Sequence, residues 1–440
     1  MPDSAHIKIA PLANRLDQAT NEETLGRLIS VSLEPLLGEE RRVARVVIPR
    51  VLPLRDGSYA IQYFIIFDER REGFPPNLML WGVLLNEEQE PPRYAEYQEV
   101  VLFWASLRLM IPLFPFDPEL PALSGMWNLD WRRHDILAPR PFQLDEEVTF
   151  TPQRLLGYRF AKRCVIHGLL QSRNTMVPPE SAPSTIKLLR PAAARRLKHN
   201  LETLAGLGLD GLTGHHLGTP KTYFTDLEPG IIVSEYVNDP SLHELIGDAE
   251  YHNACAAAGR LLKSVHAQSD LNLDSHTAED ELAMLGERIG RVANVGVEHV
   301  NVMRRTLERL SATAGIISDV EPRLSHRDFY DKQVLYSSSR TTLVDCDTLQ
   351  LADPALDYGN FLAHQFLRGI QMSKHKSSTN GGAESFMIGY GTQAHGFKNR
   401  VNWWRTASLL RLATIYCLRP SWRRLTPDLL AEAEAHTQRD

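Results

Sequence analysis

Three polar side chains have the types and the spacing of a metal-dependent reaction centre: Asp328, Gln333 and Asp345. Two runs of strand-forming residues, 334–336 and 341–344, lie between them, and the serine-rich segment that separates these runs is typical of a turn. If the two strands pair across this turn, Gln333 lies opposite the residue that precedes Asp345, and Asp328 lies at the same open end of the hairpin. Oxygen ligands gathered at a strand end are what a hard cation such as Mg²⁺ requires. The hairpin therefore predicts a magnesium site.

The composition is that of an ordinary globular protein. The 440 residues suffice for two or three domains with a sizeable core. Hydrophobic residues make up 43% and charged residues 23% of the chain, and the net charge of −6 argues against a nucleic-acid partner held by phosphate contacts. Cys164, Cys255, Cys346 and Cys417 are far apart, which favours a reducing compartment and argues against a disulfide framework or a zinc site.

The sequence also bears on location. The N-terminal residues lack a basic start followed by a long apolar core, so no signal peptide is expected. No apolar run approaches the ~20 residues that a membrane helix requires, and the most apolar stretch, 107–116, is interrupted by Pro112 and Pro115. We therefore expect a cytoplasmic protein without a membrane partner.

Residues 1–145 have the pattern of an α+β domain. A helix with a capped start follows Asn21, and strands follow over residues 44–86, with a hairpin turn signal at residues 55–58. Residues 107–150 are rich in proline and aromatic side chains, which predicts an irregular, well-packed connector between two subdomains.

A second region of strand character follows. Residues 152–189 repeat the order of strand, turn, longer strand, loop and strand that residues 52–85 show. This similarity is either a weak internal duplication or the mark of two separate antiparallel sheets. The turn at residues 159–163 is basic. In the last strand, which is mostly apolar, the alternation of side chains places Lys187 on the face opposite its apolar neighbours.

From Pro191 the hydrophobic period becomes helical. Leu197, Leu201 and Leu204 mark the buried face of a first helix. A strand is expected at residues 230–237. Further helices are expected over residues 241–246, 256–266, 278–312, 354–370 and 401–436.

The order of these elements and their motifs resemble the aminoglycoside phosphotransferase and choline kinase branch of the protein-kinase-like fold, over roughly residues 150–440. Residues 326–333 are similar to the catalytic loop HxDxxxxN. Residues 345–357 are similar to the metal-binding Asp and the GDPxxD segment of that family. Residues 230–237 resemble the hinge, and residues 259–266 resemble the helix that precedes the catalytic loop.

The resemblance implies an α+β, bilobal fold. A small antiparallel β N-lobe over residues 146–236 would bind the nucleotide, and a large helical C-lobe over residues 237–440 would carry the catalytic loop and the acceptor site. Residues 1–145 would form an N-terminal α+β cap domain. Shorter family members lack a counterpart of this cap, whereas maltokinase-like proteins resemble the chain in having one.

The resemblance also implies roles for the polar residues in phosphoryl transfer, a reaction that depends mainly on positioning and charge neutralisation. Asp328 would accept the proton of a substrate hydroxyl or orient that hydroxyl. Asp345 would ligate Mg²⁺, and Gln333 would supply a neutral oxygen to the second metal site. Asp347 is either a further metal ligand or a solvated acid.

Four residues are implied in cofactor binding. Lys187 would reach the α- and β-phosphates of the nucleotide. Glu202, which follows on the next helix, would hold this lysine by an ion pair. Glu235 and Val237, in the hinge, would contact the nucleotide.

The chain departs from the family pattern in its phosphate-binding residues. Gln333 stands where Asn is usual, and its extra methylene moves the amide oxygen, although maltokinase-like proteins also carry Gln here. The glycine-rich loop is replaced by the basic turn 159–163, whose side chains could face phosphate instead. Asp353 and Asp357 are expected to be structural, capping a helix and holding the catalytic loop. A solvated helical face is expected for Arg405, Arg411, Arg419, Arg423 and Arg424.

These features predict a phosphotransferase, dependent on ATP (or GTP) and Mg²⁺, that moves the γ-phosphate to a hydroxyl of a small molecule. Aminoglycosides or other antibiotics, sugars and amino alcohols are all open as acceptors. The alternative is a pseudokinase-like nucleotide-binding or regulatory protein without turnover, which Gln333, the missing glycine loop and the N-terminal extension favour. No nucleic-acid partner is expected, and the oligomeric state is open.

Overall fold

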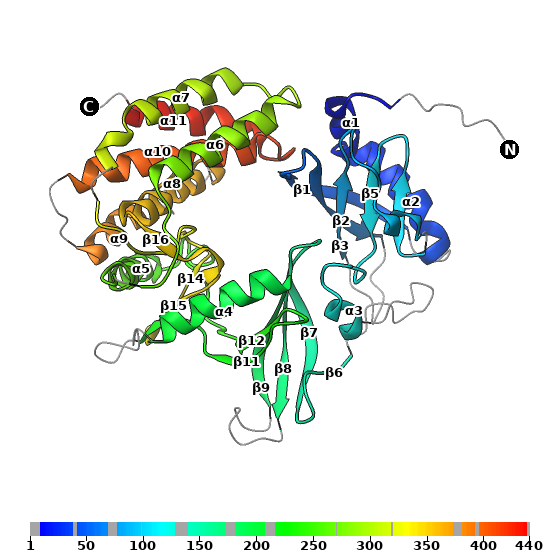
Figure 1. Ribbon diagram of the computed structural model, residues 1–440, viewed down its shortest axis with the longest axis horizontal. Helices are drawn as coiled ribbons and strands as arrows, with labels where there is room; N and C mark the ends of the chain where they lie inside the picture. Colours follow the sequence, from blue (N-terminus) through cyan, green and yellow to red (C-terminus); the bar gives the residue numbers. More distant parts are fainter. Residues whose placement is uncertain are drawn as a thin grey trace.

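The computed structural model describes residues 9–37, 42–68, 77–97, 99–127, 140–172, 181–206, 216–269, 271–317, 320–372, 381–391 and 396–437. The chain folds into three parts: an N-terminal domain, an N-lobe built on an antiparallel sheet, and a helical C-lobe (Figure 1). This arrangement confirms the α+β fold class predicted from the sequence.

The N-terminal domain packs two helices against a five-stranded antiparallel sheet. Its elements are α1 (Leu12–Ala19), α2 (Glu22–Leu37), β1 (Val43–Pro53), β2 (Tyr59–Phe67), β3 (Asn77–Leu84), a 3₁₀ turn (Arg93–Glu96), β4 (Val101–Trp104), β5 (Leu109–Pro112) and α3 (Ala122–Met126). The strands follow the order β1-β2-β3-β5-β4. Helix α2 buries Leu25, Ile29 and Leu33, whose spacing of four places them on one face.

The segment 107–150 is more regular than its prolines predicted. Strand β5 lies inside the sheet, between β3 and β4, and Pro112 is its last residue. Two further strands, β6 (Phe142–Gln143) and β7 (Val148–Arg159), belong to the N-lobe. Residues 128–139 lie outside the described residues. The prediction of an irregular connector was wrong for these strands, because a proline at a strand end does not prevent pairing.

The N-lobe is a six-stranded antiparallel sheet with one helix across it (Figure 1). Besides β6 and β7 it contains β8 (Arg163–Ser172), β9 (Ala182–Leu189), α4 (Pro191–Gly206), β11 (Thr222–Asp226) and β12 (Ile231–Glu235), in the strand order β11-β12-β9-β8-β7-β6. Along β9, Ile186 and Leu188 are fully buried, so Lys187 projects from the opposite face. Gly230 precedes β12 with φ +75°, and a Cβ there would lie 1.8 Å from the carbonyl oxygen of Leu189, so only glycine fits.

The C-lobe consists of helices and two small sheets. Its elements are α5 (Tyr251–His266), α6 (Ala278–Ala293), α7 (Val300–Ala312), β13 (Arg323–Ser325), β14 (Val334–Tyr336), β15 (Arg340–Leu343), β16 (Gln350–Ala352), α8 (Ala355–Gln371), α9 (Gly382–Tyr390), α10 (Phe397–Tyr416) and α11 (Thr426–Thr437). Helix α10 buries Trp403 and Trp404 and lies against α8 and α11. Among the described residues, no helix combines the length and the apolar character needed to cross a bilayer.

The hairpin β14–β15 has the predicted register. Tyr336 pairs with Thr341. The N–H of Val344 donates to the carbonyl oxygen of Gln333 at 2.9 Å, and Asp345 follows directly. The sequence-based prediction that Gln333 lies next to Asp345 is therefore confirmed.

Two local predictions had different outcomes. The predicted cap of α8 is displaced by one residue: Pro354 is the N-cap and the helix begins at Ala355, although Asp353 Oδ1 still accepts the N–H of Ala355 at 2.9 Å. The helix expected over residues 241–246 was wrong: this segment forms turns, and Ser241 makes a β-bridge with Leu335. Pairing with the β14–β15 hairpin prevails over the weak helical pattern there.

Each of the three parts contacts the other two (Figure 1). The indole N–H of Trp81 donates to the carbonyl oxygen of Tyr158 at 2.6 Å, joining the N-terminal domain to the N-lobe. The hydroxyl of Tyr59 donates to the carbonyl oxygen of Arg291 at 2.7 Å, joining the same domain to α6 of the C-lobe. The two lobes meet where β10 (His216–Gly218), which follows α4 in the chain, pairs with β15. The N-terminal domain thus bridges both lobes.

Candidate active site

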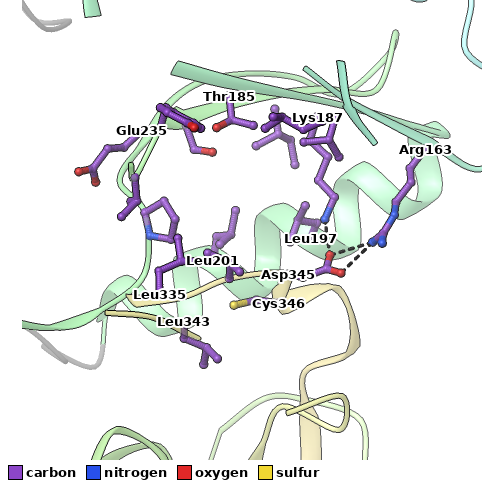
Figure 2. A pocket seen from close by; sticks show the side chains of 18 residues that line it. Arg163, Thr185, Lys187, Leu197, Leu201, Glu235, Leu335, Leu343, Asp345 and Cys346 are labelled. Carbon is purple, nitrogen blue, oxygen red and sulfur yellow. Dashed lines mark hydrogen bonds and ion pairs between the residues drawn. The ribbon is translucent and has the colours of Figure 1, made fainter. Parts of the chain in front are cut away.

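A cavity of about 290 Å³ lies between the N-lobe sheet and the β14–β15 hairpin (Figure 2). Arg163, Lys187 and Asp345 lie at one end, and Glu235 lies at the other. Such a space, apolar in the middle and cationic at one end, fits a flat heteroaromatic group joined to an anion. The aliphatic walls include Leu156, Val165, Leu197, Leu201, Leu335 and Leu343.

Two carboxylates and two cations form one ion-pair cluster at the charged end of the cavity. Lys187 Nζ lies 2.8 Å from Asp345 Oδ1 and 2.5 Å from Asp347 Oδ1. Arg163 Nη1 lies 2.8 Å from Asp345 Oδ1 and 3.3 Å from Asp347 Oδ2. Burial would raise the pKa of Asp345, but Lys187 and Arg163 hold it well below its usual range. The cluster therefore keeps Asp345 ionised.

The backbone at Asp345 is unusual. This residue has φ 61° and ψ 48°, a left-handed conformation that is uncommon outside glycine. It ends the hairpin and starts a 3₁₀ turn over Cys346–Thr348. Asp347 lies in this turn, which brings its carboxylate to the same two cations as Asp345. Strained residues of this kind concentrate at functional sites.

The predicted ion pair between Lys187 and Glu202 was wrong. Lys187 pairs with the hairpin carboxylates, whereas Glu202 Oε1 lies 3.1 Å from Nζ of Lys198 and is largely exposed. The reason is the helical period: α4 turns Leu197 and Leu201 into the cavity, which leaves Glu202 on a different face. Burial alone would lower the pKa of Lys187, but Asp345 and Asp347 raise it. The carboxylates of the hairpin thus hold the lysine.

The side chains that could hold Mg²⁺ are Asp345, Asp347 and Gln333. Gln333 is buried, and its amide nitrogen lies 3.4 Å from Oδ2 of Asp345. Within the part of the chain that the structure describes, no group of three or more His, Cys, Asp and Glu side chains could hold a metal ion. One or two carboxylates and an amide oxygen nevertheless fit Mg²⁺, which completes its shell with phosphate oxygens and water.

The catalytic loop is anchored by a buried carboxylate. Asp357 accepts the backbone N–H groups of His326 and Arg327, each at 2.6 Å, and lies 3.2 Å from Nε2 of His266. These bonds hold Arg327 in a left-handed conformation with φ 67°. The arrangement agrees with the structural role expected for Asp357, and it fixes the position of the neighbouring Asp328.

Asp328 is half-buried and lies near the ion-pair cluster that contains Asp345. Burial raises its pKa, Arg411 and His326 oppose that rise, and Asp345 adds to it. No hydrogen bond to its carboxylate is formed by the described residues. A carboxylate with a raised pKa and open oxygens can accept a proton from a bound hydroxyl group.

The hinge residues line the other end of the cavity. The Glu235 side chain is bound by Arg340, whose Nη2 lies 2.9 Å from Oε2, and Figure 2 shows it pointing away from Asp345. The backbone N–H of Glu235 donates to the carbonyl oxygen of Lys221 at 2.8 Å. Val237 also lines the cavity, and none of the described residues bonds its backbone N–H. The backbone N–H of Val237 is therefore available to a ligand, whereas the Glu235 carboxylate is bound by Arg340.

The basic turn between β7 and β8 is held by the N-terminal domain. The buried carboxylate of Asp117 accepts the N–H of Ala161 at 2.9 Å and the hydroxyl of Tyr158 at 3.0 Å. Burial and the nearby Arg159 lower the pKa of Lys162 to about 8. The turn thus carries closely spaced cations that are suited to phosphate. Sequence reasoning found these cations, but it had no signal for Asp117.

Arg411 and Arg419 contradict the predicted solvated face, because both are half-buried. Nη2 of Arg411 donates to the side-chain oxygen of Asn360 at 2.6 Å, and Asn360 donates to the carbonyl oxygen of Phe329 at 2.9 Å. This chain of bonds ties Arg411 to the catalytic loop. The expectation holds for Arg423 and Arg424, which are exposed, whereas Arg405 pairs with Glu432 at 2.5 Å.

Comparisons with known proteins agree with this geometry. Residues 169–373 match the model of a family described as "Phosphotransferase enzyme family". This match confirms the resemblance seen in the sequence and the predicted enzyme class, that of a small-molecule phosphotransferase. No curated protein matches the chain.

Several solved structures are similar to the chain at low identity. A choline/ethanolamine kinase family protein from Mesorhizobium loti is 13% identical over 62% of this chain and 85% of its own, with a TM-score of 0.44. An ethanolamine kinase from Plasmodium vivax is 12% identical over 66% and 80%, with a TM-score of 0.42. An aminoglycoside phosphotransferase from Streptomyces rimosus is 13% identical over 59% and 92%, with a TM-score of 0.40. The chain is thus similar to the phosphotransferase enzyme family over residues 169–373, slightly less than half of its length, and an N-terminal domain precedes that region.

Proposed function

We propose that this chain is an ATP- and Mg²⁺-dependent phosphotransferase that moves the γ-phosphate to a hydroxyl of a small molecule. One observation carries the proposal: Lys187, Arg163 and Asp345 meet at one end of an aliphatic cavity, close to the loop that holds Asp328. The cavity suits the base and sugar of a nucleotide, and the cations suit its phosphates.

The side chains divide the reaction among themselves. The acceptor oxygen forms a bond to the γ-phosphorus, while the bond from that phosphorus to the bridging oxygen of ADP breaks. The proton of the hydroxyl passes to Asp328, whose raised pKa suits a proton acceptor. Lys187 and Arg163 neutralise phosphate charge, and Asp357 keeps the loop in place.

The proposal includes a cofactor pair and a division of the chain. Mg²⁺, when bound, supplies positive charge to the phosphate oxygens. Asp345 and Gln333 would hold it, with Asp347 beside them, and the nucleotide is ATP or GTP. Residues 1–145 act as a cap, residues 146–236 bind the nucleotide, and residues 237–440 bind the acceptor. We place the activity in the cytoplasm, where ATP is supplied.

A second candidate is a nucleotide-binding protein without turnover. One observation favours it: Lys187 and Arg163 both occupy the carboxylate of Asp345, and the amide nitrogen of Gln333 faces it at 3.4 Å. If these contacts persist when the nucleotide binds, Asp345 does not reach the metal ion and the phosphoryl group is not transferred.

A thermal-shift experiment with ATP or GTP, with and without Mg²⁺, separates the two candidates. The phosphotransferase should show a rise in Tm that requires the metal and that disappears in Asp345→Ala. ADP release should then rise with one of a panel of hydroxyl acceptors and fall in Asp328→Asn. A metal-independent shift without ADP release supports the second candidate, and no shift with either nucleotide contradicts both.

A further inference from the structure

A side chain of α4 is bonded to the 3₁₀ turn that follows Asp345. The side-chain amide of Asn200 donates to the carbonyl oxygen of Cys346 at 2.9 Å. Asn200 is 1% exposed and Cys346 is also buried, so the bond is shielded from water. Asp345 precedes Cys346 in the chain, and Asp347 follows it. The bond therefore acts on the residue that lies between the two carboxylates of the ion-pair cluster.

The same turn is also bonded to the catalytic loop. The hydroxyl of Thr348 donates to the carbonyl oxygen of His326 at 2.8 Å. Nε2 of His326 lies 3.0 Å from the carbonyl oxygen of Val344, which precedes Asp345. The catalytic loop thus contacts both ends of the segment 344–348, and a helix of the N-lobe contacts its middle.

The backbone of this segment requires such contacts. Asp345 adopts a left-handed conformation with φ 61°, which costs free energy in any residue except glycine. Such a conformation persists only where the surrounding structure fixes it. The buried carbonyl of Cys346 also needs a donor, because a buried polar group without a partner is costly. Without the amide of Asn200, the turn can relax and move the carboxylates of Asp345 and Asp347.

Helix α4 is itself attached to the C-lobe close to Asn200. Nε2 of the neighbouring His199 lies 2.9 Å from the carbonyl oxygen of Asn272, a residue of the C-lobe. Strand β10, which follows α4 in the chain, pairs with β15, and β15 ends at Leu343, two residues before Asp345. The helix is therefore held on both sides of the cavity and can serve as a fixed support for the turn.

The helical period explains why this support comes from Asn200 and not from Glu202. Asn200 lies three residues after Leu197 and four before Leu204, and all three side chains are buried on one face of α4. Glu202 lies on another face and does not reach Lys187. The contact of α4 with the site is thus a neutral amide bound to the backbone of the turn, in place of the ion pair that the sequence predicted.

We propose that Asn200 is a positioning residue for the metal site: its bond to Cys346 holds Asp345, and Asp347 beside it, where they ligate Mg²⁺ in the nucleotide complex. This inference rests on the proposed function and adds a residue that does not line the nucleotide cavity. Residues that orient metal ligands in this way act on metal affinity. The effect of Asn200 should therefore appear in the coupling between metal and nucleotide, and not in the affinity for the nucleotide alone.

Calorimetric titration of ADP into the full chain, with and without Mg²⁺, tests the inference. The measured quantity is the ratio of the Kd for ADP without Mg²⁺ to the Kd with it. Asn200→Leu, which is similar in size but lacks the donor, should lower this ratio about tenfold and leave the Kd without metal unchanged. Asn200→Gln keeps the amide donor on a longer side chain, and its ratio should lie between those of Asn200→Leu and the wild-type chain. Tm shows that each variant is folded, and Asn200→Ala replaces Asn200→Leu if that variant does not fold.

Leu204→Ala separates this role from a general loss of stability. Leu204 lies one helical turn beyond Asn200 on the buried face of α4, and it does not line the nucleotide cavity. The substitution should lower Tm because it leaves a space in the core, yet it should keep the wild-type ratio. A wild-type ratio in the folded Asn200 variant without the donor, or an equal fall in Leu204→Ala, overturns the inference. A wild-type chain whose ADP affinity does not respond to Mg²⁺ contradicts the proposed function instead.

Discussion

The carboxylate of Asp117 accepts the backbone N–H of Ala161 at 2.9 Å. Asp117 follows the last strand of the N-terminal sheet, and Ala161 lies in the turn that leads to Arg163. The same carboxylate oxygen accepts the hydroxyl of Tyr158 at 3.0 Å, so one buried side chain fixes two points of the turn. The N-terminal domain therefore helps to shape the cationic end of the nucleotide cavity.

Replacing Asp117 should weaken nucleotide binding without removing any residue of the cavity. In Asp117→Ala the N–H of Ala161 loses its acceptor, which should cost about 1–3 kcal/mol of unfolding free energy. The loosened turn should raise the KM for ATP about tenfold, a change of about 1.4 kcal/mol in binding. Denaturation and steady-state kinetics measure the two effects. Glu119→Gln, an exposed neighbour, is the control, and an unchanged KM in Asp117→Ala would contradict the assigned role.

Turnover should fall as the pH is lowered, with Asp328 as the titrating group. Burial raises its pKa above 3.8, the ordinary value. A proton acceptor must be ionised, so the rate is full above the raised pKa and is lost as the pH falls through it. Asp328→Asn should lower kcat by ~10²-fold or more, keep the Kd for ADP, and remove the acidic limb of the pH profile. A variant with wild-type kcat would exclude Asp328 from this role.

Lys187 and Glu202 should differ sharply in their effect on nucleotide affinity. Lys187→Met removes a cation that reaches into the cavity and should weaken ADP binding about ten- to a hundredfold. Glu202→Gln should leave the Kd unchanged, because Glu202 pairs with Lys198 outside the cavity. Calorimetry on the folded chain decides, with Lys198→Met as the control. Equal losses of ADP affinity in Lys187→Met and Glu202→Gln would support the ion pair between Lys187 and Glu202 that the sequence predicted.

His364 should make the fold sensitive to acid. It is buried and stacked on Tyr330 with ring centres 4.2 Å apart, and burial lowers its pKa from 6.5 to about 3. The folded state therefore requires a neutral imidazole, so this contribution is complete above pH 6.5 and is lost as the pH falls toward 3. At pH 5 the loss is about 2 kcal/mol.

Urea denaturation at pH 7.5 and pH 5 measures this effect. His364→Gln should flatten the dependence of the unfolding free energy on pH. His199→Gln, at an exposed position on α4, should leave it as in the wild-type chain. The same slope in His364→Gln and in the wild-type chain would exclude His364 as its source.

The hairpin was predictable from the sequence because its information is local. A turn of four residues sets the pairing of Tyr336 with Thr341, and the register then places Gln333 beside Asp345. Asp357 was likewise assigned correctly, since its motif follows the hairpin directly and its two bonds reach back to one short loop. These contacts can be predicted without knowing how the rest of the chain folds.

The environment of Arg411 could not be predicted in the same way. Its helix, α10, is buried on nearly every side, so no polar face marks which arginine meets the catalytic loop. The contact with Asn360 depends on how α8 and α10 pack. Asp117 is a similar case, because its partner Ala161 uses a backbone N–H, which every residue except proline possesses. The predicted ion pair of Glu202 was wrong because the rotation of α4 about its axis turns this residue away from Lys187.

The bridging position of the N-terminal domain has a consequence for how the chain reaches its native state. The hydrogen bond from Tyr59 to Arg291 joins residues 232 positions apart. This domain is synthesised before the two lobes and can build its own sheet early, since its strands are mostly neighbours in sequence. Its attachment to α6 must wait until the C-lobe has been synthesised, and contacts of such long sequence separation form late and slowly. Maturation of this protein should therefore end with the N-terminal domain closing against α6 of the C-lobe.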